Sequence, residues 1–189
     1  QKVLGGEPAH GMLILSPRAV DRRENYTPPW PMPKIFRLTK GGKLIEGIFV
    51  GETINTPSML AVEDYLFCLD WAQSVGGLQG LIARAEANAK AVWDFCDQQD
   101  WIDNLATDAA TRSTTSVCLK FTDDRISDGA AFAKAIAKRL ADANVALDIG
   151  GYRAAPPGLR LWCGGTVETA DIEAMLPWRA HAFEAEINA

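Results

Sequence analysis

Two arginines near the end of the sequence are spaced so that they can act together on an anion. Arg153 follows the tripeptide Gly-Gly-Tyr, and Arg160 comes after the turn sequence Ala-Ala-Pro-Pro-Gly. Arg160 and Trp162 alternate with the apolar residues of the run 159–163, which places both on one face of a predicted strand. A guanidinium group donates paired hydrogen bonds to a carboxylate or a phosphate, so the two arginines are a candidate site for an acidic metabolite.

The same two arginines also have a plainer interpretation. Two cations held close together repel each other unless an anion lies between them, and the protein itself can supply that anion. Asp148 and Glu168 are acids close to them in the sequence. Composition therefore leaves two possibilities open, an external anion or local ion pairs.

The tripeptide Asn55-Thr56-Pro57 is a second candidate anion site. It precedes a run with helical periodicity, and proline is favoured at the first position of a helix. Free backbone N–H groups and the positive end of the helix dipole attract a phosphate at such a place. The alternative is that Thr56 is simply the N-cap of the helix.

The remaining residues that could do chemistry form no pattern by themselves. Lys2 is either a solvated charge or a functional amine, and its position alone does not separate the two. His10 and His181 have no partner pattern and are interpreted as structural or surface residues. The four cysteines form no Cys-x-x-Cys pair, so we expect free buried thiols of a reducing compartment and no metal site. They are Cys68, Cys96, Cys118 and Cys163.

The composition excludes two classes of protein. The 189 residues contain 19 Lys and Arg against 24 Asp and Glu, which gives a formal net charge of −5. A surface that binds nucleic acid needs a basic face, so no nucleic-acid partner is expected. No window approaches the ~18 consecutive apolar residues of a membrane span. We therefore expect a protein that does not enter a membrane, and the thiols of a reducing compartment predict that it is cytoplasmic.

The first part of the chain is predicted to contain few elements. The apolar run 12–15 predicts a buried strand, and Ser16-Pro17 is typical of a helix start. The proline-rich residues 27–33 predict an extended connector. Residues 34–50 predict a hairpin, because Gly-Gly in the middle permits the positive φ of a tight turn. A helix follows and stops at Gly76-Gly77.

From residue 76 onward, helices and strands alternate. Residues 78–96 keep a helical apolar rhythm, and the runs 116–121, 145–149 and 159–163 predict strands. Asp128 and Thr169 are expected to open two further helices, and Pro177 should kink or restart the second. Helices that bury one face against strands predict an open-faced α/β sandwich, of the α+β type. The predicted division is a first part, 1–75, too small to close a core, and a compact domain, 76–189.

Three segments in this order resemble the phosphoserine aminotransferase family. They are the pair Gln-Lys before a glycine-containing loop, the hairpin PKIFRLTKGGKLIEGIF with GETINTPSM after it, and DIGGYRAAPPGLRLWCG near the C-terminus. The likeness runs through essentially the whole chain. It implies the aspartate-aminotransferase-like fold (fold type I), a pyridoxal 5′-phosphate cofactor and a homodimer. The sequence departs from the family pattern at Tyr152, where many members have histidine.

The resemblance implies a role in cofactor binding for four residues. Lys2 would be the Schiff-base lysine, which afterwards moves the substrate α-proton as general base and acid. Gln1 would contact the cofactor near its phosphate. Asn55 and Thr56 would reach the phosphate of the cofactor in the neighbouring subunit.

The resemblance also implies the substrates. Arg160 would hold the α-carboxylate of the amino acid, and Arg153 would help to hold a second anion, the phosphate of phosphoserine or the side-chain carboxylate of glutamate. The reaction would transfer an amino group between glutamate and 3-phosphohydroxypyruvate in serine biosynthesis. Members of the family often serve vitamin B6 synthesis as well, with a related phosphorylated substrate.

Finally, the resemblance implies that the chain corresponds to the C-terminal half of such an enzyme, its partner being the missing N-terminal half. Residues 1–75 would be the remnant of the large cofactor-binding domain and 76–189 the small C-terminal domain. The chain alone is expected to be inactive, because the ring stacked on the cofactor and the acid at its pyridine nitrogen would be absent. Two alternatives are another aminotransferase of this fold, for example one that uses glyoxylate, and a non-catalytic α/β module that binds an acidic metabolite or a protein.

Overall fold

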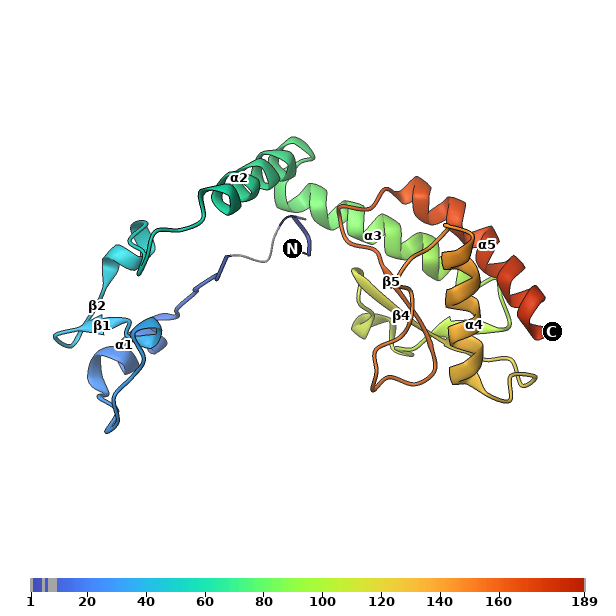
Figure 1. The fold of residues 1–189 in the computed structure, drawn as a ribbon, viewed down its shortest axis with the longest axis horizontal. Helices are drawn as coiled ribbons and strands as arrows, with labels where there is room; N and C mark the ends of the chain where they lie inside the picture. Colours follow the sequence, from blue (N-terminus) through green and yellow to red (C-terminus); the bar gives the residue numbers. More distant parts are fainter. Residues whose placement is uncertain (1, 5, 7–9, 189) are drawn as a thin grey trace. The chain divides into compact units, whose positions relative to one another are not determined.

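A computed structural model describes residues 2–4, 6 and 10–188 of the chain (Figure 1). The chain divides into two compact units, one of residues 1–6 with 68–189 and the other of residues 7–67. The boundary falls within helix α2, which runs from Met59 to Ser74. The assignment of residues 1–75 and 76–189 to two domains of a larger enzyme stays a prediction.

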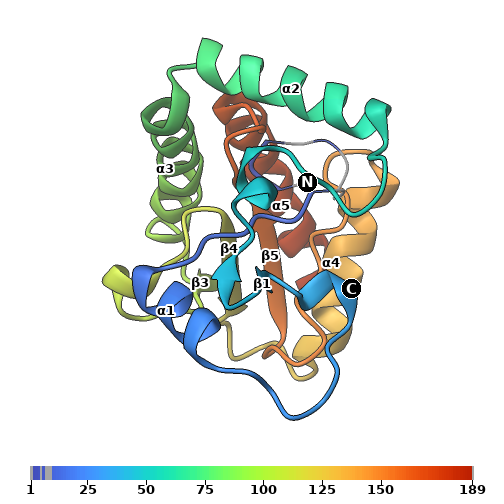
Figure 2. The same ribbon diagram turned by 90° about the vertical axis from the view of Figure 1, so that its left-hand side faces the viewer.

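The unit that contains the C-terminus is built on a three-stranded antiparallel sheet. Its strand order is β3 (Ile102–Asn104), β4 (Ser116–Phe121), β5 (Gly158–Trp162). Helices α3 (Gly77–Cys96), α4 (Gly129–Asp142) and α5 (Thr169–Ile187) accompany it, and α5 contacts both of the others. Figure 2 shows the three helices side by side behind the strands. The predicted α/β sandwich is therefore confirmed.

Alternation along β4 and β5 decides which face of the sheet the helices cover. Val117 and Leu119 on β4 and Leu159 and Leu161 on β5 are buried in the core that the helices complete. Burying one such side chain contributes about 1.5–3 kcal/mol. Beside them the ring of Trp101 stacks on Phe183 from α5, with 4.2 Å between the ring centroids. No described helix of this unit covers the other face of the sheet, where the side chains of β4 and β5 are half-buried.

In the unit that contains the C-terminus, the helix ends follow the predicted signals with one exception. The carboxylate of Asp128 accepts hydrogen bonds from the backbone N–H groups of Ala130 and Ala131, at 3.0 and 2.9 Å, and so caps α4. Gly76 has a φ of 102° and separates α2 from α3, as expected for a glycine stop. The exception is α5, which runs through Pro177 as a single helix, so the restart predicted there is wrong, whereas the alternative of a kink stays a prediction.

Asn88 on α3 fixes the segment that leads out of β5. Its side-chain amide donates to the carbonyl oxygens of Cys163, Gly164 and Val167, at 3.3, 3.3 and 2.9 Å. Its carbonyl oxygen accepts from the hydroxyl of Thr169, at 2.7 Å. Asn88 is fully buried, so these bonds are shielded from water and hold the end of β5 in place.

The unit of residues 7–67 is built from short elements. Helix α1 (Pro17–Asn25) starts at the predicted Ser16, whose hydroxyl accepts from the N–H of Ala19 at 3.2 Å. The predicted hairpin is present, and Gly41 and Gly42 take φ values of 59° and 74° in its turn. Its strands, β1 (Thr39–Lys40) and β2 (Lys43–Leu44), have only two residues each, and short 3-10 helices flank them at Lys34–Phe36 and Glu46–Val50.

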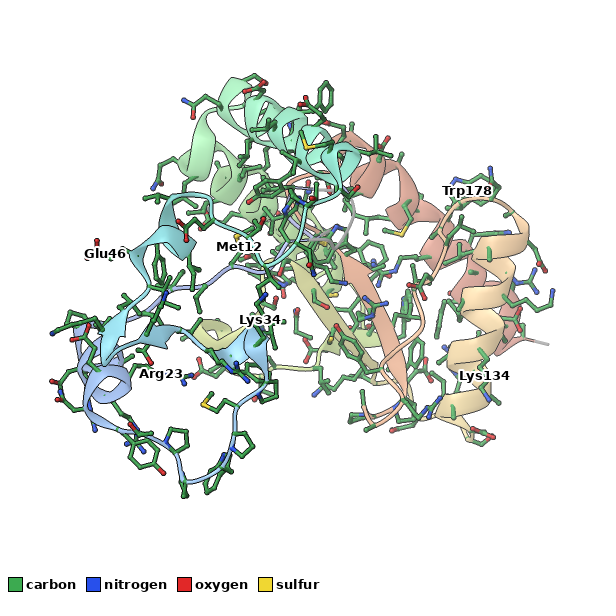
Figure 3. The ribbon with its side chains drawn as sticks, turned by 60° about the vertical axis from the view of Figure 1, so that its left-hand side comes forward. Met12, Arg23, Lys34, Glu46, Lys134 and Trp178 are labelled. Carbon is green, nitrogen blue, oxygen red and sulfur yellow. The ribbon has the colours of Figure 1, made fainter. Side chains whose placement is uncertain are left out.

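Two predicted strands are wrong. Met12–Leu15 pairs with no strand among the described residues, and Ile14 is 91% exposed (Met12 is labelled in Figure 3). A strand needs a neighbour to bond its N–H and C=O groups, and this segment has none here. Residues 145–149 do not form a strand either, because Asn144 and Asp148 take left-handed φ values of 54° and 53°. Within the described ranges, a single bridge between Gly150 and Leu159 remains beside β5.

Candidate functional site

The sheet face without helices carries a group of polar and aromatic side chains. Across β4 and β5, Cys118 lies opposite Arg160 and Ser116 lies opposite Trp162. Opposite residues of antiparallel strands point to the same side, so these four residues share one face. Each of them is half-buried. The predicted placement of Arg160 and Trp162 on one face is thus present, and we call this group the open face.

Arg160 is the most constrained residue of the open face. The ring of Tyr152 lies over its guanidinium, with 4.9 Å from Cζ to the ring centroid. Its Nη2 donates to Oδ2 and to the backbone oxygen of Asp148, at 3.3 and 3.4 Å. Its Nε is buried and has no hydrogen-bond partner among the described residues. One guanidinium is therefore fixed in place with part of its donor capacity unused.

The ion pair of Arg160 is the local alternative that the sequence left open. The side chain of Asp148 is 94% exposed, whereas that of Arg160 is 18% exposed. An ion pair with such an exposed partner contributes about 0–1 kcal/mol. The carboxylate of a ligand can therefore replace Asp148 at little cost. Glu168, the other acid considered, pairs with Arg84 instead.

Tyr152 and Ser116 are site residues that the sequence did not bring together. The Tyr152 hydroxyl lies 3.2 Å from the hydroxyl of Ser116. The two residues are 36 positions apart, and only the register of β4 against β5 brings the loop before β5 over Ser116. A usable signal was the serine at the start of the predicted strand 116–121, on the same face as Cys118.

Lys2 belongs to the same unit as the open face. Its Nζ lies 5.8 Å from the ring centroid of Trp162, within the reach of a cation–π contact. The side chain is exposed, and it makes no hydrogen bond or ion pair with the described residues. The structure thus brings the amine of Lys2 to the strand that carries Arg160.

Arg153 does not share these contacts. It is exposed in the turn before β5 and forms no ion pair or hydrogen bond with the described residues. No described contact joins its guanidinium to that of Arg160. A role for Arg153 in holding a second anion stays a prediction.

Asn55 and Thr56 belong to the other unit, and both are exposed. The prediction that Thr56 caps the helix is wrong, because α2 begins at Met59 and the hydroxyl of Ser58 accepts from the N–H of Ala61 at 3.4 Å. Proline disfavours the helical conformation in the residue before it, which keeps Thr56 outside the helix. A phosphate site at these residues stays a prediction. Gln1 lies outside the described residues.

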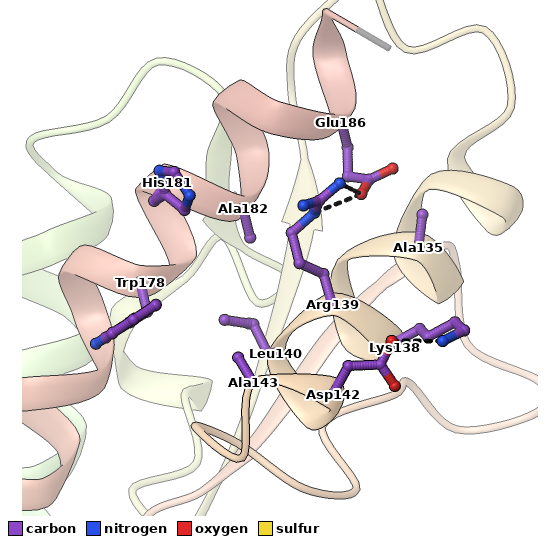
Figure 4. Close-up of a pocket in the computed structure, with 10 residues that line it drawn as sticks. All are labelled: Ala135, Lys138, Arg139, Leu140, Asp142, Ala143, Trp178, His181, Ala182 and Glu186. Atoms are coloured by element: carbon purple, nitrogen blue, oxygen red, sulfur yellow. Dashed lines mark hydrogen bonds and ion pairs between the residues drawn. The ribbon is translucent and has the colours of Figure 1, made fainter.

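A cavity of about 580 Å³ between α4 and α5 contains none of the described candidate residues (Figure 4). Its charged side chains pair with one another: Arg139 with Glu186 at 2.6 Å, and Lys138 with Asp142. His181 lines this cavity and is exposed, in keeping with its interpretation as a surface residue. The paired charges leave little to attract a charged ligand.

The described part of the chain offers neither a metal site nor a membrane-spanning helix. There, no group of three or more His, Cys, Asp or Glu residues could hold a metal ion. All four cysteines are free, with Cys118 half-buried and the others buried. Among the described helices, none combines the length and the apolar character needed to cross a bilayer.

Similarity to known proteins supports the resemblance seen in the sequence. No family model matches the chain. It is 54% identical over 186 residues to phosphoserine aminotransferase of Methanosarcina mazei, and 55% identical over 185 residues to that of Methanosarcina barkeri. Each match covers 97% of this chain and 48% of the relative, so the chain spans about half the length of the curated relatives it matches.

Solved structures support the fold. Phosphoserine aminotransferase from Bacillus circulans subsp. alkalophilus is 18% identical with a TM-score of 0.54, and the match covers 75% of this chain and 42% of that one. The PLP-bound phosphoserine aminotransferase from Trichomonas vaginalis is 21% identical with a TM-score of 0.57, over 68% of this chain and 34% of that one. The resemblance inferred from the sequence and the expected fold are both confirmed.

Proposed function

We propose that this chain, homologous over 97% of its length to phosphoserine aminotransferases, is the part of such an enzyme that carries the cofactor lysine. The complete enzyme would convert phosphoserine and 2-oxoglutarate to 3-phosphohydroxypyruvate and glutamate, with pyridoxal 5′-phosphate as cofactor. Identities of 54 and 55% support this proposal. The structural observation that carries it is the Lys2 amine, 5.8 Å from Trp162 on the strand of Arg160.

The residues of the open face fit an aldehyde cofactor and an anionic substrate. The exposed Lys2 amine forms no ion pair with the described residues, so no carboxylate has to be displaced before it condenses with an aldehyde. Lys2 would hold the cofactor through Nζ, and Gln1 would lie near its phosphate. When bound, pyridoxal phosphate supplies the electron sink that makes the substrate α-proton acidic.

Arg160 and Lys2 would have different roles: Arg160 would bind the substrate and Lys2 would transfer its proton. Arg160 would bind the α-carboxylate in place of Asp148, with two parallel N–H···O bonds. This contact fixes the direction of the substrate Cα–H bond. Lys2 Nζ would accept the α-proton and return a proton later in the reaction.

The remaining candidates would complete the site in a homodimer. Arg153 is available for the second anion of the substrate, because no described acid pairs with it. Asn55 and Thr56 would contact the cofactor phosphate of the neighbouring subunit. The chain without its other half would be inactive. Serine biosynthesis in the cytoplasm is the proposed setting, and vitamin B6 synthesis is a proposed second use.

The test uses the complete protein that contains this chain. We expect Lys2→Ala to lower the rate of glutamate formation from phosphoserine and 2-oxoglutarate by roughly 10³-fold, within the range for a lost proton-transfer group. Borohydride reduction followed by mass spectrometry should place the cofactor mass on Lys2. Lys134→Ala, at an exposed lysine of α4, is the matched control and should leave the rate unchanged (Figure 3).

Three outcomes would contradict the proposal in different ways. Full activity of Lys2→Ala would favour a non-catalytic module. A preference for glyoxylate over 3-phosphohydroxypyruvate would favour another aminotransferase of this fold. Turnover by the 189-residue chain alone would contradict its expected inactivity.

A further inference from the structure

We propose that Tyr152 is a positioning residue that clamps the guanidinium of Arg160 on the open face, with the hydroxyl of Ser116 as its anchor. The inference rests on the proposed function in one respect, because Arg160 is taken as the group that binds the substrate carboxylate. Tyr152 itself touches no substrate in this account. It determines which edge of the guanidinium faces the ligand.

The exposure of Tyr152 indicates that core packing does not explain its position. Its side chain is 57% exposed, yet both its ring and its hydroxyl contact other side chains. The ring lies 4.9 Å from the guanidinium carbon of Arg160, and the hydroxyl lies 3.2 Å from that of Ser116. A ring over a guanidinium is attracted by the charge and also limits the rotation of the arginine side chain.

The anchor ties a loop with few other bonds to the sheet. Between Asp148 and Gly158, the described backbone makes one bridge, Gly150 to Leu159, beside which the N–H of Arg160 donates to the carbonyl of Ile149 at 2.8 Å. It also makes one turn bond, from the N–H of Ala155 to the carbonyl of Tyr152 at 3.0 Å. Ser116 lies on the central strand β4, which pairs with both other strands. A hydrogen bond between Tyr152 and Ser116 therefore restricts the motion of the loop relative to the sheet.

The clamp leaves one edge of Arg160 for a ligand. Nε is buried, and Nη2 donates to the exposed Asp148. Nη1 has no partner among the described residues. A carboxylate that replaces Asp148 would therefore bind end-on, to Nη1 and Nη2, and not side-on through Nε.

The test is an NMR experiment on the ¹⁵N-labelled 189-residue chain. The Nε–H signal that disappears in the Arg160→Lys variant is assigned to Arg160. In the unsubstituted chain this signal should be shifted by the tyrosine ring current and protected from exchange with water. Tyr152→Leu should abolish the shift and raise the exchange rate about threefold, an effect at the low end of what the loss of a cation–π contact produces. Tyr26→Leu is the matched control, because Tyr26 is 54% exposed and belongs to the other unit.

A double-mutant cycle tests the anchor. Tyr152→Phe and Ser116→Ala should each give the same partial increase in exchange, and the double variant should add nothing further, because both remove one bond. An unchanged Arg160 signal in Tyr152→Leu, or additive effects in the cycle, would overturn the clamp. The cycle also decides the question if Tyr152→Leu does not fold.

A titration with L-glutamate separates this inference from the proposed function. L-Glutamate should move the Arg160 signal of the unsubstituted chain, and the movement should be smaller in Tyr152→Leu. If L-glutamate leaves the signal in place while Tyr152→Leu changes its shift and exchange, the clamp stands and the carboxylate-binding role of Arg160 fails.

Discussion

Arg179 on α5 is a buried cation outside the open face. It is fully buried, and none of its three guanidinium nitrogens has a hydrogen-bond partner among the described residues. Its Cζ lies 5.0 Å from the ring centroid of Phe95. Burial lowers the pKa of Arg179 to about 10, although the nearby thiols of Cys96 and Cys163 oppose this shift. Burial likewise raises the pKa of Cys163 to about 11.

We expect Cys163 to make the stability of the chain depend on pH above about 9. Its pKa rises from 9.0 to about 11 on folding, so between these values the unfolded chain releases a proton that the folded chain retains. The contribution of the Cys163 thiol to the free energy of unfolding should therefore be constant below pH 9 and fall as the pH rises toward 11. The full loss is at most about 3 kcal/mol. Urea unfolding between pH 8 and pH 10 measures the first part of this fall in the free energy of unfolding.

Cys163→Ala is the comparison for this experiment, because alanine does not titrate. Its stability should fall less steeply than that of the unsubstituted chain, and equal slopes would contradict the prediction. Arg179 acts in the opposite direction and at higher pH. Folding lowers its pKa to about 10, so the folded chain loses that proton at a lower pH than the unfolded chain does, and the free energy of unfolding rises with pH above pH 10.

The face on which a site residue lies could be predicted from the sequence where it depends on a single strand. Arg160 and Trp162 share a face because side chains alternate along a strand, and the sequence shows that alternation directly. Tyr152 and Ser116 could not be paired in this way, because their contact depends on strand register and on the course of a loop. Arg179 could not be identified as buried either, since an arginine in an amphipathic helix normally faces water.

The element with a clear internal defect is α5. Pro177 lies inside this helix, exposed to solvent, and it cannot donate a hydrogen bond to the carbonyl oxygen of Glu173. The helix nevertheless continues, because Ile172, Met175 and Phe183 bury its other face on both sides of the proline. Tertiary packing therefore outweighs the local preference for a break.

We expect Pro177→Ala to stabilise the unit of residues 68–189. Alanine restores the missing donor and removes the clash with the preceding turn, which is worth about 1–3 kcal/mol in a helix that has already adapted. The midpoint of urea unfolding, followed by circular dichroism, measures the gain. Pro17→Ala is the control, because a proline at the first position of α1 costs little. A lower midpoint for Pro177→Ala would contradict this account.

The sequence was informative about elements that carry their own signals. The helices at 77–96 and 129–142 and the strand at 116–121 have strong periodicity, the second helix also has the Asp128 cap, and all three elements are present. The runs 12–15 and 145–149 were equally apolar, but a strand also needs a partner and a suitable φ at each residue. The three-residue strand β3 is too short to show a period.

The two units of the whole chain differ in how much they bury. The unit of residues 68–189 has a continuous core, whereas none of the described residues from 10 to 67 is buried. Large apolar side chains stay exposed there, including Ile14 and Val50 at 91 and 84%. Ordering a residue costs about 1–2 kcal/mol of backbone entropy, which burial normally offsets. Residues 10–67 lack that compensation.

Hydrogen exchange should therefore divide the 189-residue chain into two classes. Amides of β1 and β2 should exchange at nearly unprotected rates, whereas those of α3, β4 and α5 should be protected up to the free energy of global unfolding. Removing residues 1–67 should leave the slow class unchanged. In the complete enzyme that we propose, residues 10–67 should gain protection, because the other half would cover their apolar side chains. Equal protection of β1–β2 and α3 in the chain alone would show that residues 10–67 are stable without burial, contrary to this argument.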